Sequence, residues 1–83
     1  MDIQTPYVSS VGKRVARAIR SAREAAGLSQ ESLAEIAGLN RGYLGEIERA
    51  SANPSIVTLE KISKALNIPL AELLHNPETS GDA

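Results

Sequence analysis

Apolar residues recur at intervals of three and four along most of this chain, which is the spacing of one face of an α-helix. The first run predicts a helix over residues 11–26, and its expected inner stripe is Val11, Val15, Ala18, Ile19, Ala22 and Ala26. Gly27 follows, a residue that suits the left-handed turn at a helix end. No stretch shows the sustained alternation of a strand, so the pattern predicts an all-α fold.

Two short helices are predicted next, over residues 30–37 and 41–49. Ser29 and Asn40 are suitable N-caps for them, and Gly38 between them predicts a tight turn. In the first of these helices Leu33 and Ile36 are expected to face inward, and in the second Leu44 and Ile47. Two short helices joined in this way form a helix-turn-helix pattern.

The second half of the chain predicts two more helices. Ser55 can cap the first, whose expected inner residues are Ile56, Leu59, Ile62 and Leu66. Pro69 suits the first turn of a fifth, short helix over residues 70–74. The expected organisation is an N-terminal arm (1–10), one five-helix domain (11–75) and a flexible C-terminal tail (76–83).

The composition excludes several classes of protein. A domain of 83 residues is marginal in stability, and without cysteine neither a disulfide nor a thiolate zinc site can reinforce it. Nothing resembles a signal peptide or a membrane span, so we expect a cytoplasmic protein. The one histidine, His75, stands near the expected frayed end, and no catalytic spacing of side chains is evident. We therefore expect no enzyme activity, metal, cofactor or small-molecule ligand.

The net charge of −1 argues against a nucleic-acid partner, but the charges are unevenly distributed. Residues 11–26 carry five basic residues and one acid, Glu24. The basic residues are Lys13, Arg14, Arg17, Arg20 and Arg23. Such a local positive field can attract a polyanion even when the total charge is near zero. The alternative is a solvated helix face with no partner.

Two glycines mark the predicted helix over 41–49. On a helical wheel, Leu44 and Ile47 define its inner side. The opposite side holds Gly42, Gly45, Glu46 and Arg49, with Arg41 and Tyr43 at the flanks. A glycine inside a helix costs about 1 kcal/mol relative to alanine. Outward glycines suit the close approach of a bulky partner such as the DNA major groove, and simple tolerance is the equal alternative.

Residues 11–74 resemble the Xre/Cro family of phage-repressor-like helix-turn-helix domains. The residues that carry the resemblance are Gly27–Glu31, Leu33-Ala34, Ala37-Gly38, Tyr43-Leu44, Ile47–Arg49, Asn53–Ser55 and Leu59–Ile62. The short chain and the run Asn40–Arg49 are most similar to restriction-modification controller proteins. The resemblance implies a bacterial or phage-encoded transcription regulator. It would bind double-stranded DNA as a homodimer, on inverted half-sites about 34–36 Å apart.

The resemblance also makes the helix over 41–49 the recognition helix, whose N-terminal residues reach base edges. The base-facing candidates are Asn40, Arg41, Tyr43 and Glu46. Arg41 can contact guanine at two points, and its alternative is a phosphate. Glu46 can accept from cytosine, although holding Arg41 or Arg49 in position is favoured. Tyr43 can touch a thymine methyl group, touch a phosphate, or only pack.

The family pattern points to a second set of residues for the DNA phosphates. These are Gln30, Arg49, Asn53 and Ser55, with Arg20 and Arg17 extending the surface. The resemblance further implies a structural ion pair between Arg23 and Glu48 inside the domain.

The chain departs from the family pattern in two places. Ala50 stands where a glycine usually follows the Glu-Arg pair, which predicts a different turn after the recognition helix. Gly42 and Gly45 stand where family members often carry side chains that read a DNA base or support a residue that does. Specificity is therefore expected to depend on Arg41 and on DNA deformability.

The last predicted helix is rich in apolar residues for so short a chain. Ile68, Leu70, Leu73 and Leu74 are expected to form a two-fold dimer interface. Packing of this set onto the helix over 11–26 is the alternative. A different function also stays open, because the same fold can serve as an interaction module of antitoxin or anti-repressor type, with another protein as its partner.

Overall fold

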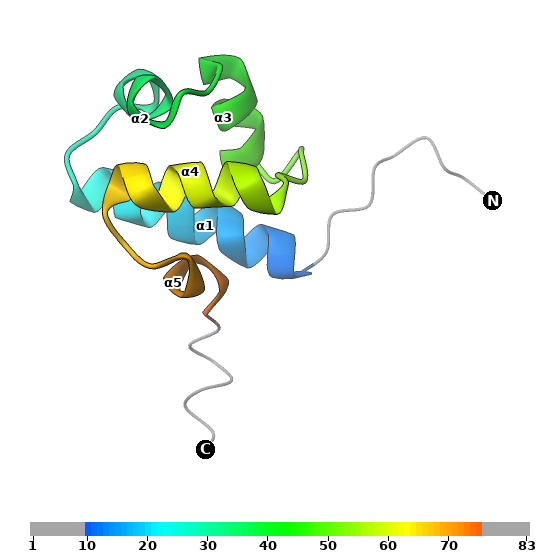
Figure 1. The fold of residues 1–83 in the computed structure, drawn as a ribbon. Helices are drawn as coiled ribbons and strands as arrows, with labels where there is room; N and C mark the ends of the chain where they lie inside the picture. The colour runs from blue at the N-terminus through cyan, green and yellow to red at the C-terminus, as the bar shows by residue number, and fades with distance from the viewer. Residues whose placement is uncertain (1–9, 76–83) are drawn as a thin grey trace.

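A computed structural model describes residues 10–75, which form five helices (Figure 1). They are α1 (Ser10–Ala25), α2 (Gln30–Ala37), α3 (Arg41–Glu48), α4 (Ile56–Leu66) and α5 (Leu70–Leu74). This part of the chain contains no strand, which confirms the predicted all-α fold. Apart from Ser10, the expected arm lies outside the described residues, and so does the expected tail over 76–83.

The helices surround one hydrophobic core (Figure 1). α1 and α4 lie across the centre of the domain, with α2 and α3 on one side of them and α5 on the other. Every helix supplies at least one of the fully buried large side chains, which are Ile19, Leu33, Leu44, Ile47, Ile62 and Leu73. Burial of each such side chain contributes about 1.5–3 kcal/mol. α3 packs mainly against α1 and α2, and these two helices set its orientation.

Side-chain caps begin three of the helices, as the sequence predicts. The Ser29 hydroxyl accepts the backbone N–H of Ser32 at 3.0 Å, at the start of α2. The Asn40 side-chain oxygen accepts the N–H of Tyr43 at 3.1 Å, at the start of α3. Ser55 does the same for Thr58 at 3.0 Å, at the start of α4. These bonds satisfy backbone donors that the first turn of a helix leaves unpaired.

The turn after α3 keeps the shape that glycine usually provides, so the expectation of a different turn at Ala50 is wrong. Ala50 has a φ of +60°, in the left-handed region. Its N–H donates to the Ile47 carbonyl at 3.0 Å, and that of Ser51 donates to the Glu46 carbonyl at 2.9 Å. This pair of bonds is the Schellman motif, which requires the left-handed residue. Alanine therefore adopts a backbone conformation that costs it about 1 kcal/mol.

Four apolar residues expected to face inward are exposed. Ile36 is 58% exposed, because α2 buries the stripe of Leu33, Ala34 and Ala37, which lies on another side of the helix. Ile56 is 73% exposed, since the buried stripe of α4 begins one turn later, at Leu59. Val11, in the first turn of α1, and Ala26, just beyond its last residue, are also exposed.

The opposite correction applies to Leu73, which the sequence assigns to a dimer interface. Its side chain is fully buried within the core cluster of the monomer. α5 packs against both α1 and α4, and Leu73 faces the space that these helices enclose. Leu73 is therefore a core residue and unavailable to a partner subunit.

No helix within residues 10–75 has the length and apolar character needed to cross a membrane.

Candidate nucleic-acid interface

α3 has one buried side and one exposed side. Its buried residues are Leu44, Gly45, Ile47 and Glu48, and its exposed residues include Arg41, Gly42 and Glu46. Asn40, just before the helix, is exposed as well, but its side-chain oxygen is committed to the cap. The amide nitrogen of Asn40, which has no part in the cap, is left to face a ligand. Arg41 presents a guanidinium, with five N–H donors, at the exposed N-terminus of the helix.

Tyr43 and Glu46 lie differently from Arg41. Tyr43 is half-buried and packs against the core, so packing accounts for at least part of its role. Glu46 is exposed, and within residues 10–75 it forms no ion pair with Arg41 or Arg49. The structure thus does not bring the Glu46 carboxylate together with either arginine that it is expected to hold in position.

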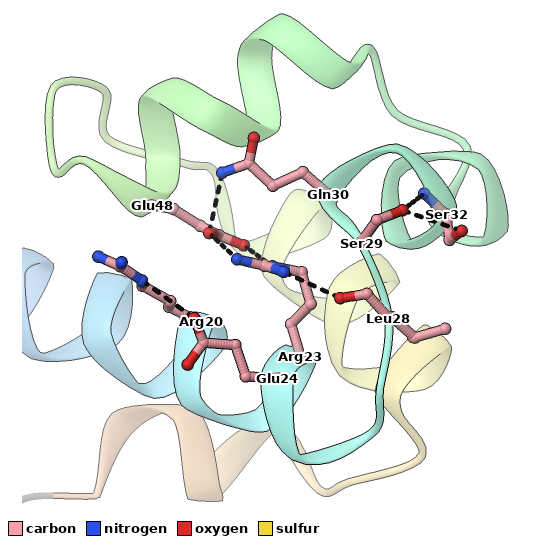
Figure 2. A network of polar contacts seen from close by, with 8 residues as sticks. All are labelled: Arg20, Arg23, Glu24, Leu28, Ser29, Gln30, Ser32 and Glu48. Atoms are coloured by element: carbon pink, nitrogen blue, oxygen red, sulfur yellow. Dashed lines mark hydrogen bonds and ion pairs between the residues drawn. The ribbon is translucent and has the colours of Figure 1, made fainter.

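Arg23 on α1 and Glu48 on α3 form the ion pair that the resemblance implies (Figure 2). Arg23 Nε donates to Glu48 Oε2 at 2.8 Å and Nη2 donates to Oε1 at 3.0 Å. Arg23 Nη1 donates to the Leu28 carbonyl at 2.9 Å, in the turn before α2. The Glu48 hydrogen bond raises the pKa of Arg23, which outweighs the lowering by burial, and the charges of Glu48 and Glu24 raise it further.

Gln30, the first residue of α2, completes this network (Figure 2). Its Nε2 donates to Glu48 Oε1 at 3.0 Å, so the buried carboxylate is bonded to both α1 and α2. Sequence reasoning assigns Gln30 only to the DNA phosphates and misses this contact. Nothing in the sequence signals it, because the two residues lie 18 positions apart on helices whose relative placement is a tertiary property.

The other phosphate candidates are spread over α1, the end of α3, and the loop that leads to the start of α4. Arg49 is the exposed C-cap of α3, and Asn53 is exposed in the loop before α4. Ser55 caps α4, where its hydroxyl also bonds to the Thr58 hydroxyl at 3.0 Å. Arg20 on α1 is exposed, and its Nε lies 3.4 Å from Glu24 Oε2. Such an exposed pair is weak and easily exchanged for another anion.

Gly45 is buried, so its expected position on the outer side of α3 is wrong. A Cβ at this position would come within 3.1 Å of Arg49 Nη1 and 3.5 Å of Gln30 Oε1. Gly42 is exposed as expected, and a Cβ there would lie 3.0 Å from the Asn40 side-chain oxygen. The two glycines therefore have different surroundings, although they are only three residues apart.

Comparison with known proteins assigns this arrangement to a family. The helix-turn-helix family HTH_3 matches residues 19–73. The control protein C.SmaI of Serratia marcescens is 47% identical over 60 residues, which are 72% of this chain and 71% of that protein. The chain belongs to the HTH_3 (Xre/Cro-type) helix-turn-helix family.

Other relatives of this HTH_3 chain agree with the assignment. The crystal structure of the restriction-modification controller protein C.AhdI from Aeromonas hydrophila matches with a TM-score of 0.75 at 40% identity, covering 78% of this chain and 98% of that chain. The immunity repressor protein of Bacillus phage phi105 is 45% identical over 65 residues, which are 78% of this chain but only 42% of the repressor.

These matches confirm the resemblance to the Xre/Cro family. The family is one of non-enzymatic DNA-binding regulators. The chain is therefore a helix-turn-helix DNA-binding transcription regulator of controller or repressor type.

Proposed function

We propose that this chain acts as a homodimer on an inverted-repeat DNA operator, with α3 in the major groove of each half-site. The observation that carries the proposal is the two-sided character of α3. Leu44 and Ile47 fix one side in the core, and Glu48 ties the same side to α1 and α2. The other side presents Arg41 from a rigid support, which direct reading of a base requires.

Arg41 is the proposed base-reading residue, through a two-point contact with guanine O6 and N7. Asn40, Tyr43 and Glu46 stand beside it as further base-facing residues. Asn40 would contribute its amide nitrogen, since the oxygen caps α3. The exposed Glu46 carboxylate suits the amino group of a cytosine, and it has no ion pair to break within the described residues.

The proposed phosphate contacts surround α3. Arg49 and Arg20 supply exposed positive charge. Three polar side chains stand beside them: Gln30 at the start of α2, Asn53 in the loop between α3 and α4, and Ser55 at the start of α4. Backbone N–H groups at the start of a helix favour an anion, aided by the helix dipole. These contacts would set the position of the domain on DNA without reading its sequence.

The proposed dimer interface uses what remains exposed of the apolar set around α5. Leu74 is 43% exposed, and Ile68 and Leu70 are half-buried. Leu74 also lines a groove of about 300 Å³ together with Val11, Gly12, Val15, Asn53, Pro54 and Leu59. A second copy would cover this apolar surface, and the symmetry of the dimer would match that of an inverted repeat.

Selection of binding sites from a random DNA pool, at near-physiological salt, tests the proposal. We expect a paired, inverted motif whose half-sites lie one helical turn apart. Sedimentation of the free protein should show a dimer, and Leu74→Glu should shift it toward the monomer. Enrichment of no sequence would contradict the proposal and favour a protein-interaction module, which a pull-down would then test. We place the activity in the bacterial cytoplasm, where such a regulator meets its DNA.

A further inference from the structure

Gly45 lies in the interior of α3, where glycine is a poor helix former compared with alanine. Its φ is not in the left-handed region that favours glycine, so the backbone of α3 does not demand it. The residue is buried, so direct contact between its backbone and DNA does not explain it either. A reason for the missing side chain is therefore to be sought in the groups that lie over Gly45 within the protein.

Two side chains occupy the space above Gly45. Arg49 Nη1 is 3.1 Å, and Gln30 Oε1 3.5 Å, from the position that a Cβ would take. The first distance is shorter than an ordinary van der Waals contact for a Cβ, so an alanine would displace the guanidinium by a few tenths of an ångström from this position. The second is an ordinary contact, which leaves Gln30 in place.

The Gln30 amide is itself oriented by the buried ion pair. Its Nε2 donates to Glu48 Oε1 at 3.0 Å, and its oxygen points away from Glu48 (Figure 2). This oxygen lies 3.5 Å from the position that a Cβ on Gly45 would take. A hydrogen-bond acceptor and the positively charged Arg49 group therefore face the same space. Attraction between this acceptor and the charged group favours the position of Arg49 over Gly45, although the two side chains form no hydrogen bond within the described residues.

We propose that Gly45 is a positioning residue: it leaves the space in which the Arg49 guanidinium lies against α3, in the orientation that contacts a DNA phosphate. The proposal rests on the phosphate role of Arg49 in the proposed function. Restricting the arginine before DNA arrives lowers the entropy lost on binding, and this is the advantage that outweighs the poor helix propensity of glycine.

A double-mutant cycle tests the coupling between the two residues. The four proteins are the natural chain, Gly45→Ala, Arg49→Ala and the double variant, with affinity for the selected operator measured by fluorescence anisotropy at several salt concentrations. We expect Gly45→Ala to weaken binding about fivefold when Arg49 is present and less than about twofold when it is replaced. Arg49→Ala should flatten the salt dependence by about one unit, as loss of one phosphate contact does.

Gly42→Ala is the matched control. It makes the same chemical change in the same helix, but its methyl group would meet the Asn40 side chain rather than Arg49. Its effect on affinity should therefore be the same with and without Arg49. Thermal unfolding of Gly45→Ala should occur at the same temperature as in the natural chain or higher, because alanine is the better helix former. Weaker binding by a protein of undiminished stability excludes loss of folding as the cause.

Each other result has a distinct meaning. If Gly45→Ala weakens binding equally with and without Arg49, the positioning role is wrong, while the phosphate role of Arg49 stands. If Arg49→Ala changes neither affinity nor salt dependence, the phosphate role is wrong and the positioning role fails with it. If Gly45→Ala unfolds at a lower temperature than the natural chain, loss of folding could explain weaker binding. NMR relaxation of the side-chain Nε–H groups in the natural chain then tests the positioning role. Arg49 should be more ordered than the exposed Arg41, and equal disorder would overturn the proposal.

Discussion

Arg23 and Glu48 lie 25 residues apart in the sequence and form a two-point ion pair whose side chains are only 12% and 3% exposed. The pair joins α1 to α3, and the bond from Arg23 to the Leu28 carbonyl extends the link to the turn before α2. It therefore fixes α3, the proposed recognition helix, relative to the basic helix α1. Three of the five N–H donors of the Arg23 guanidinium are thus bonded, two of them to the Glu48 carboxylate and one to a carbonyl.

Removal of Glu48 should destabilise the domain before it has any specific effect on DNA binding. Glu48→Ala leaves the buried Arg23 charge without its partner and Gln30 without its acceptor. We expect the free energy of unfolding to fall by about 3 kcal/mol, measured by urea denaturation. Glu24→Ala is the control, because it breaks an exposed pair with Arg20 and should cost less than about 1 kcal/mol. Equal losses in the two variants would contradict a structural role for the buried pair.

The stability contributed by Arg23 should not depend on pH between neutrality and about pH 11. Its pKa is raised in the folded state, so its contribution is fully present below the ordinary arginine pKa and is lost only above it. In Arg23→Lys the paired lysine would lose its contribution as the pH rises beyond its ordinary pKa of about 10.4. Urea denaturation at about pH 8 and about pH 11 should show the difference in stability between the two proteins widening at the higher pH. An unchanged difference would argue against a charge-dependent pair.

Ala50→Gly should stabilise the protein. Ala50 is held at a φ of +60°, which glycine adopts without steric cost. We expect a gain of about 0.5–1 kcal/mol in the free energy of unfolding, after the greater flexibility of glycine in the unfolded chain is counted. Ala71→Gly, at an exposed helical position of α5, should have the opposite sign. Destabilisation by both substitutions would show that the strain at Ala50 is smaller than the flexibility that glycine adds.

Arg41→Ala should reduce the preference for the operator over random DNA. A two-point contact with guanine contributes about 1–3 kcal/mol of discrimination, so affinity for the selected site should fall by about tenfold more than affinity for random DNA. Anisotropy titrations with both DNAs measure this ratio. An equal loss on the two DNAs would instead assign Arg41 to a phosphate.

Arg20→Ala should weaken binding to every DNA sequence by the same factor. If Arg20 neutralises one phosphate, the slope of log affinity against log salt should flatten by about one unit. Arg20→Lys keeps the positive charge and should retain most of the slope. An unchanged slope in Arg20→Ala would leave Arg20 as a solvated residue paired with Glu24.

The number, order and approximate limits of the helices follow from local patterns in the sequence. Ser29, Asn40 and Ser55 act as N-caps as predicted, because a cap bonds to a backbone group only three residues away. Gly27 and Gly38 end their helices in left-handed turns for the same local reason. The family resemblance added the Arg23–Glu48 pair, which no local pattern indicates.

Tertiary structure alone decided which faces are buried. A helical period defines a stripe, but in helices as short as α2, α3 and α5 it does not settle where the stripe is centred. Ile36 is therefore exposed, and Leu73 and Gly45 are buried, against expectation. Ile56, in the first turn of the longer α4, is exposed because the buried stripe begins only at Leu59. Each outcome depends on which other helix covers that face. The contact of Gln30 with Glu48 and the position of the Gln30 amide over Gly45 depend on it too, because packing of the whole core sets how α2 and α3 meet.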